Sequence, residues 1–235
     1  MPDFIEVYED VLSAEQCQSL INLLQDSEHK TLGTIQGKTQ VSEASIQELS
    51  LNDHPKYELV VQQLSTLIVP YLLQYFNLYY QVLIAGVGFT VYHPTTKEIV
   101  DLTTDNFEEV GRPQIGILVT QLFRLGMLRL HKSEAENAVA TIFHSESYPQ
   151  KHNDDALHRI LNIELSLQDV PEGGLLEFYE FDRKIPAKRG RLVIFPSYFT
   201  HAHRQTKPIS QDKYQISTWL LFKQTKQLYS TSQAQ

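Results

Sequence analysis

Hydrophobic residues recur at helical spacing in the first third of the chain. Ser13 stands three residues before Gln16, which is the spacing of a capping box at a helix start. The apolar positions around it repeat every three or four residues: Leu12, Cys17, Leu20, Ile21 and Leu24. A second amphipathic helix is predicted to begin at Pro55, and we expect Pro70 to kink or restart it. These helices are expected to support a sheet.

The rest of the chain has the pattern of strands. Residues 82–91 and 114–130 are rich in apolar residues, and the polar stretch 94–113 separates them. Short alternating runs divided by Gly/Pro turns fill 138–222, with the clearest turn at 171–174. This pattern is typical of an antiparallel sandwich or barrel. Because helices come first and strands later, the sequence predicts an α+β fold.

The length and composition predict one globular domain. A chain of 235 residues with 42% hydrophobic and 20% charged residues can bury a sizeable core. We expect a single domain over 1–235, in which 1–80 form a helical support and 81–137 an insertion and sheet extension. The remaining segment, 138–222, would form the core that carries the chemistry.

Charge and cysteine content narrow the function classes. The formal net charge of −8 argues against a nucleic-acid or anionic-membrane partner. The single cysteine, Cys17, excludes an intrachain disulfide and favours a reducing compartment. The N-terminus lacks the pattern of a secretory signal, and the uninterrupted apolar stretches are shorter than the ~20 residues of a membrane helix. We therefore expect a cytoplasmic protein without a membrane or nucleic-acid partner.

His152 and Asp154 form an H-x-D pair, a spacing that could bind a metal ion. On an extended backbone, residues i and i+2 point to the same side, so both side chains could bind one metal ion. A second histidine, His201 or His203, follows about fifty residues later. Two histidines and one carboxylate leave open positions on the ion, as in non-haem Fe(II) oxygenases. The alternative for the pair is a set of polar surface residues in a loop.

Lys213 adds a cation to this candidate site. It lies ten residues after His203 and begins an alternating run with Gln215, Ser217 and Trp219 on one sheet face. A dicarboxylate that chelates iron at one end would need an ammonium group for its far carboxylate, with the Ser217 hydroxyl as a further donor. The alternative for Lys213 is an exposed lysine on an edge strand.

The segment 138–222 resembles the 2-oxoglutarate/Fe(II) oxygenase superfamily, and within it the prolyl 4-hydroxylase-like branch. The motifs that carry the resemblance stand in the family's order: His152-Asn-Asp154, Arg159, PEGGLLEF (171–178), IPAKRGRLVIFPSYFTHAHR (185–204) and KYQISTWLLF (213–222). The resemblance implies a double-stranded β-helix, a jelly-roll or cupin-like core, with supporting N-terminal helices. It also implies Fe(II) as cofactor, with 2-oxoglutarate and dioxygen as cosubstrates.

The resemblance implies that Fe(II) is bound by His152, Asp154 and His203. The ten-residue step to Lys213 favours His203 over His201, which would then be a neighbour on the same face.

Four residues would contact the cosubstrate. Lys213 would anchor the far carboxylate of 2-oxoglutarate, and Ser217, Tyr148 and Ser166 would add further contacts. Ser166 stands where the family often has a tyrosine hydroxyl.

Three features depart from the family pattern. His144 and Glu146 form a rival H-x-E pair, but they lie eight residues earlier and spoil the alignment with Arg159. Gln205 replaces a glycine found in bacterial relatives. The segment 91–130 is longer and more apolar than expected, and a lid, an added strand pair or a homodimer contact are the alternatives for it.

The predicted function is hydroxylation of a C–H bond coupled to decarboxylation of 2-oxoglutarate. The substrate would be a small molecule or a peptide, with peptidyl proline the family's best-known target. The alternative from another class is a non-catalytic jelly-roll module that binds a ligand or partner, because the fold hosts many functions. A cupin-type isomerase or lyase is a third possible function. Such an enzyme would not need a lysine placed to bind a dicarboxylate.

Overall fold

The computed structural model describes residues 2–32, 46–84, 88–138, 142–149, 154–224, 226 and 228. The chain divides into two compact units. The first joins residues 1–64 with 125–221, and the second joins 65–124 with 222–235.

Helix α1, Ala14–Asp26, begins at the predicted capping box. Gln16 donates its backbone N–H to Ser13 Oγ at 3.2 Å, and Ser13 donates its own N–H to Gln16 Oε1 at 2.9 Å. The buried face of the helix is the predicted apolar stripe: Cys17, Leu20, Ile21 and Leu24. The predicted start of this helix is confirmed.

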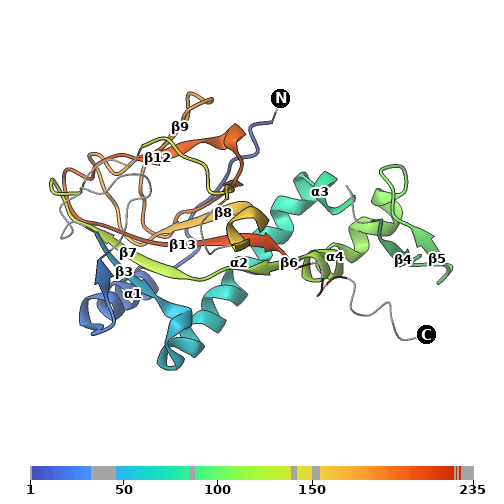
Figure 1. Cartoon of the computed structure of the whole chain (residues 1–235), viewed down its shortest axis with the longest axis horizontal. Helices are drawn as coiled ribbons and strands as arrows, with labels where there is room; N and C mark the ends of the chain where they lie inside the picture. The colour runs from blue at the N-terminus through green and yellow to red at the C-terminus, as the bar shows by residue number, and fades with distance from the viewer. Residues whose placement is uncertain are drawn as a thin grey trace. The chain divides into compact units, whose positions relative to one another are not determined.

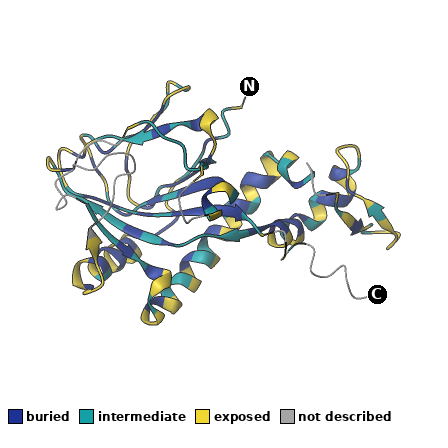
Figure 2. Cartoon of the chain, in the orientation of Figure 1, coloured by how far each residue is buried: buried dark blue, intermediate teal, exposed yellow. Residues whose placement is uncertain are grey.

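The main sheet of the first unit runs in the order β1-β11-β8-β13-β7-β3-β2, and each of these neighbouring pairs is antiparallel. The strands are β1 (Glu6–Tyr8), β2 (Thr31–Leu32), β3 (Ile46–Ser50), β7 (Arg129–Ser133), β8 (Arg159–Ser166), β11 (Leu192–Pro196) and β13 (Lys213–Phe222). Most residues of β8, β11 and β13 are buried (Figure 2).

A smaller antiparallel sheet in the order β10-β9-β12 forms a second layer (Figure 1). Its strands are β9 (Leu176–Phe178), β10 (Lys184–Ile185) and β12 (His203–Gln205). The predicted turn at 171–174 precedes β9. Gly173 there has φ +74°, and a Cβ on it would lie 2.1 Å from the Lys207 carbonyl oxygen, so this position needs glycine.

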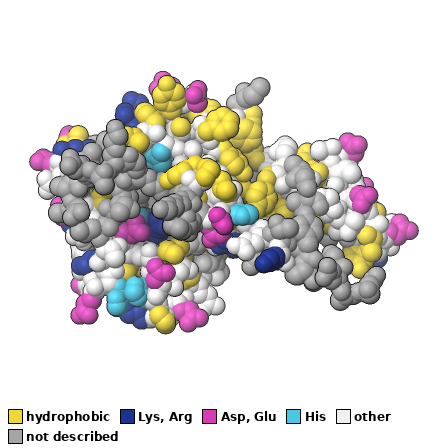
Figure 3. All heavy atoms as spheres, viewed as in Figure 1, with side chains coloured by type: hydrophobic (Ala, Val, Ile, Leu, Met, Phe, Trp, Pro, Cys, Tyr) yellow, Lys and Arg dark blue, Asp and Glu magenta, His cyan; other side chains and the backbone are white. Residues whose placement is uncertain are grey.

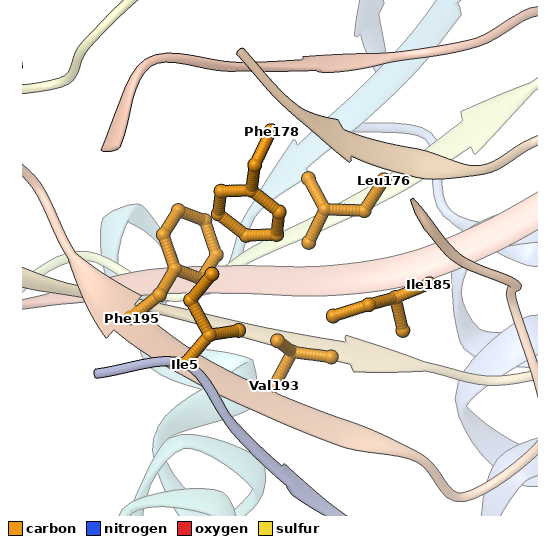
Figure 4. Close-up of a cluster of buried hydrophobic side chains, with 6 residues drawn as sticks. All are labelled: Ile5, Leu176, Phe178, Ile185, Val193 and Phe195. Atoms are coloured by element: carbon orange, nitrogen blue, oxygen red, sulfur yellow. The ribbon is translucent and has the colours of Figure 1, made fainter. Parts of the chain in front are cut away.

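Hydrophobic side chains from both layers meet in the interior of the first unit. Figure 4 shows the cluster: Ile5, Leu176, Phe178, Ile185, Val193 and Phe195. Two antiparallel sheets that enclose a shared interior, with helices earlier in the chain, confirm the predicted α+β jelly-roll core.

Helices predominate in the second unit. Helix α2, Glu58–Leu78, belongs to this unit from residue 65 onward. It continues through Pro70, so of the two predicted effects of this proline the restart does not occur. The other helices are α3 (Gln81–Ile84), a π-helix (Phe107–Gly111), a 3-10 turn (Arg112–Gln114) and α4 (Ile115–Leu122). The short strands are β4 (Thr90–Tyr92), β5 (Ile99–Asp101) and β6 (Phe123–Leu125), whose last residue belongs to the first unit.

The strand pattern predicted for 114–130 is wrong in its first half, which forms α4. The buried residues there recur every one, three or four positions, as on a helix: Ile115, Leu118, Val119 and Leu122. A short, continuously apolar run fits a buried strand and a buried helix equally well, so its hydrophobicity cannot distinguish the two.

In the part of the chain that the structure describes, one helix is long and apolar enough to cross a membrane by length and composition alone. It spans Pro55–Leu78, has a mean hydropathy of 1.3 in its best 18-residue window, and 28% of that window is buried. The expectation from uninterrupted apolar runs missed it, because polar residues such as Gln62 and Gln63 break the runs. A single such helix is weak evidence, since core helices of soluble proteins pass the same test.

Candidate metal and cosubstrate site

Three side chains with metal-binding atoms meet inside the first unit: His144, Glu146 and His203. One ligand atom from each lies within 4.8 Å of the other two. The backbone brings them together, because His144 N–H donates to the His203 carbonyl at 3.0 Å and His203 N–H donates back at 2.9 Å. His203 is the first residue of β12, so this bridge fixes the loop that carries Glu146 against the smaller sheet.

The backbone also sets the orientation of both imidazole rings. His144 Nδ1 lies 2.8 Å from the Ile142 carbonyl oxygen, and His203 Nδ1 lies 3.1 Å from the His201 carbonyl oxygen. Because a carbonyl oxygen only accepts, each Nδ1 carries the proton and donates it. Each Nε2 is then the nitrogen that can bind a metal ion.

Arg159 holds the carboxylate of Glu146. Arg159 Nη1 donates to Glu146 Oε2 at 2.8 Å, and Glu146 Oε1 lies 3.3 Å from His144 Nε2. Burial opposes ionisation of Glu146, but the hydrogen bond with His144 and the charge of Arg159 together hold its pKa below the usual value. Glu146 is therefore a carboxylate at neutral pH, the form that binds a cation.

The pKa values of the two histidines are shifted in opposite directions. Burial lowers the pKa of His203 to about 4, so its ring is neutral at pH 7. Burial also lowers the pKa of His144, but its hydrogen bonds to Glu146 and Ile142 raise that pKa above the usual value overall. Two imidazoles and one carboxylate are the donor set that non-haem Fe(II) sites use, so these residues fit an Fe(II) ion.

Of the three predicted metal ligands, His203 is the one that the structure places in this cluster of metal-binding side chains. His203 belongs to the cluster, whereas His152 lies outside the described residues. Asp154 begins a 3-10 helix, Asp154–His158, and is exposed, so it does not lie on the extended strand that the pairing assumed. A ligand role for His152 and Asp154 stays a prediction.

Both ring nitrogens of His201 contact other protein groups at hydrogen-bond distance. Its Nε2 donates to the Asp3 carbonyl oxygen at 2.8 Å, and its Nδ1 lies 2.9 Å from Thr200 Oγ1. The side chain is buried, at 5% exposure. Both ring nitrogens are therefore engaged away from the cluster, which favours His203 over His201.

A pocket of about 140 Å³ lies beside the three side chains, and they form part of its wall. Asn162 of β8 also lines it and is almost fully buried. Asn162 Oδ1 accepts a hydrogen bond from Ser197 Oγ at 3.1 Å, which fixes the amide. Asn162 Nδ2 has no hydrogen-bond partner in the described parts of the chain, so this donor is free for a bound molecule.

Ser217 lines the pocket, but its hydroxyl is engaged within the protein, and its contact with a cosubstrate stays a prediction. Ser217 Oγ lies 2.7 Å from His131 Nε2, and His131 Nδ1 lies 3.4 Å from Glu48 Oε2. Burial lowers the pKa of His131 to about 4, so this ring is neutral. Neither His131 nor Glu48 could be found from sequence, because β3 and β7 bring them to β13 only through strand pairing.

Tyr148 and Ser166 do not line the pocket that the described residues form. Both are half-buried, and Ser166 donates its backbone N–H to the Arg191 carbonyl. Their contacts with a cosubstrate stay predictions.

Lys213 is buried rather than on an exposed strand edge, at 5% exposure. Its Nζ donates to the Gly174 carbonyl oxygen at 3.0 Å and to Gln205 Oε1. Gln205 Nε2 in turn donates to Glu164 Oε2 at 2.7 Å. Burial lowers the pKa of Lys213 to about 8 and raises that of Glu164, while their mutual attraction opposes both changes.

The fold is similar to that of solved 2-oxoglutarate oxygenases. A viral collagen prolyl hydroxylase from Paramecium Bursaria Chlorella virus-1 superposes with a TM-score of 0.60 at 12% identity, covering 94% of this chain and 97% of that one. A Trichoplax adhaerens prolyl hydroxylase, in complex with a hypoxia inducible factor peptide fragment, gives 0.59 at 16% identity, covering 98% and 88%. The α-ketoglutarate-dependent carbocyclase SnoK of nogalamycin biosynthesis gives 0.52 at 11%, covering 93% and 79%.

Sequence comparison gives a family match that does not depend on the fold. No curated protein sequence matches the chain significantly. Residues 137–221, however, match the family model described as the 2OG-Fe(II) oxygenase superfamily. This segment contains the cluster of His144, Glu146 and His203 together with Lys213. Residues 137–221 are therefore similar to the 2OG-Fe(II) oxygenase superfamily, in agreement with the predicted enzyme class and its cofactor set of Fe(II), 2-oxoglutarate and dioxygen.

Proposed function

We propose that this dioxygenase binds Fe(II) through His144, Glu146 and His203 and hydroxylates a C–H bond of a peptide. The observation that carries the proposal is the convergence of three ligand atoms within 4.8 Å on the wall of a pocket. When bound, Fe(II) supplies the activation of dioxygen, coupled to decarboxylation of 2-oxoglutarate, that protein side chains cannot provide.

This ligand set is supported by how its members are held. Two backbone carbonyls orient the rings of His144 and His203, and Arg159 orients Glu146. Metal ligands are commonly fixed by such outer contacts, which preorganise them for the ion. The set predicted from sequence shares His203 and differs in the other two ligands, so alanine variants of each pair distinguish them.

The three ligands lie on the pocket wall, and the Lys213 ammonium donates to Gln205, which lines the same pocket. Gln205 also donates to Glu164, another residue of the pocket wall. In this proposal Lys213 attracts the far carboxylate of 2-oxoglutarate, and the unpaired Asn162 amide N–H donates to a bound molecule.

The surface near the ligands supports a peptide as substrate. Tyr179 and Phe199 are 67% and 81% exposed, and Ile142, two residues before His144, is 62% exposed. The Tyr179 ring contacts Phe143 at a centroid distance of 5.3 Å, and its backbone N–H donates to Ala202, so it lies beside the segments that carry the ligands.

Exposed apolar side chains of this kind are typical of sites that bind another polypeptide. Hydrophobic side chains gather on part of the visible surface in Figure 3. The formal net charge of −8 favours a basic peptide. The Trichoplax adhaerens enzyme was solved with a peptide bound, in agreement with this proposal.

Mass spectrometry of peptide products tests the function. The purified chain would be incubated with Fe(II), 2-oxoglutarate, ascorbate and a library of basic, proline-containing peptides, with free amino acids as a parallel set. We expect gain of one oxygen atom in peptides and none with the Glu146→Ala variant. Oxygen gain confined to free amino acids would reject the peptide substrate. A chain that releases no succinate under any condition would be the non-catalytic module.

A further inference from the structure

Lys213 is covered on the side that faces the pocket. Gln205 and Glu164 line the pocket, whereas Lys213 is not among the described residues that line it. The ammonium group has three donors, and Gly174 and Gln205 accept from two of them. The cation proposed to anchor the cosubstrate therefore lies behind a glutamine side chain.

Both the oxygen and the nitrogen of the Gln205 carboxamide form hydrogen bonds. Its oxygen accepts from Lys213 Nζ of β13, and its nitrogen donates to Glu164 Oε2 of β8 at 2.7 Å. Gln205 itself stands on β12 of the smaller sheet. The amide thus crosses the interior between the two sheets, and contacts at both ends fix its orientation.

We propose that Gln205 is a specificity-determining residue that withholds Lys213 from weak ligands, so that a bound 2-oxo acid reaches the ammonium only by displacing the Gln205 carbonyl oxygen. The inference rests on the proposed function, in which Lys213 anchors the far carboxylate of 2-oxoglutarate. A carboxylate is a stronger acceptor for an ammonium group than a neutral amide, so a diacid can replace Gln205 on Lys213. A 2-oxo acid without the second carboxylate cannot.

Trp219 gives a direct binding signal. It is the only tryptophan of the chain and lines the same pocket, so its fluorescence reports occupancy without turnover. The full chain, loaded with Mn(II), would be titrated with 2-oxoglutarate and with 2-oxovalerate, which has a methyl group in place of the far carboxylate. Each titration gives a Kd for the wild type and for Gln205→Ala.

The proposal predicts that Gln205→Ala binds 2-oxoglutarate about tenfold more tightly, because a hydrogen bond to a charged group no longer competes. Its Kd for 2-oxovalerate should equal that of the wild type. Gln215→Ala is the matched control, since Gln215 also lines the pocket, whereas the described hydrogen bonds of Lys213 go to Gly174 and Gln205. Unchanged or weaker 2-oxoglutarate binding, or equal tightening for both acids, would overturn the proposal.

Two further variants keep the result interpretable. Gln205→Asn shortens the side chain by one methylene and should reproduce the tightening if Gln205→Ala folds poorly. Lys213→Ala separates this inference from the proposed function. If Lys213→Ala weakens 2-oxoglutarate binding but the Gln205 variants do not tighten it, the Gln205 inference fails and the anchor stands. If Lys213→Ala leaves the binding unchanged, the anchor fails and the inference falls with it.

Discussion

The Arg159 guanidinium donates to the Glu146 carboxylate at 2.8 Å, and the same guanidinium lies 3.7 Å from the centre of the Trp219 ring. Arg159 is 5% exposed, so this ion pair is formed away from water. The stacking fixes the arginine, and the arginine fixes one oxygen of Glu146. The other oxygen of Glu146 faces His144.

Removing this arginine should weaken metal binding. We expect Arg159→Met to raise the Kd for Mn(II) by about 10- to 100-fold, as for other contacts that orient a ligand. The control is Arg129→Met, because Arg129 also lies over the Trp219 ring, at 5.0 Å, but pairs with Glu48. Equal losses in both variants, measured by calorimetric titration with Mn(II), would mean that the stacking and not the Glu146 contact matters.

The two neighbouring histidines should differ in their effects. His203→Ala is expected to abolish metal binding, whereas His201→Ala should retain it. His201→Ala should instead lower the free energy of unfolding by about 1–3 kcal/mol, because it leaves hydrogen-bonding groups of Asp3 and Thr200 without their partner. Metal titration and urea unfolding of both variants check this, and loss of metal in His201→Ala alone would reverse the assignment.

Binding of 2-oxoglutarate should weaken as the pH rises through about 8. Burial lowers the pKa of Lys213 to about 8, so above this pH the side chain loses the charge that attracts a carboxylate. Glu164 interacts with Lys213, and its carboxyl group loses its proton as the pH rises, which also disfavours a bound carboxylate. His131 is already neutral in this range because burial lowers its pKa to about 4. In Lys213→Arg the cation persists, so most of the pH dependence of Kd between pH 7 and 9 should disappear. An unchanged profile in that variant would exclude Lys213 as its source.

The buried hydrophobic cluster around Leu176 should dominate the stability of the first unit. Leu176 is 3% exposed and packs with Phe178 and Phe195, so Leu176→Ala should cost about 2–5 kcal/mol of unfolding free energy. Leu59→Ala removes the same atoms from a side chain that is 64% exposed, and should cost far less. Denaturant unfolding of the two variants measures the difference, and similar costs would show that the cluster is loosely packed.

The sequence predicted those parts of the fold that depend on local pattern. The capping box at Ser13, the turn before β9 and the strands β8 and β13 carry their signals within a few residues. Helix α4 was predicted as a strand because its first residues, 115–119, carry no polar side chain.

The site depended on contacts that are remote in sequence. The pair of His144 and Glu146 did not fit the expected spacing to Arg159, yet Arg159 contacts Glu146 directly. Spacing along the chain measures the length of a loop and not the distance between its ends. The bridge from Gln205 to Glu164 joins two sheets, so no local pattern could indicate it.

Metal titration of four alanine variants decides which residues hold the ion. Each variant would be titrated with Mn(II) and its binding stoichiometry compared with that of the wild type. His144→Ala and Glu146→Ala are expected to lose the site, while His152→Ala and Asp154→Ala should bind one ion as the wild type does. Retention of the ion by the first two variants and its loss in the last two would contradict the assignment.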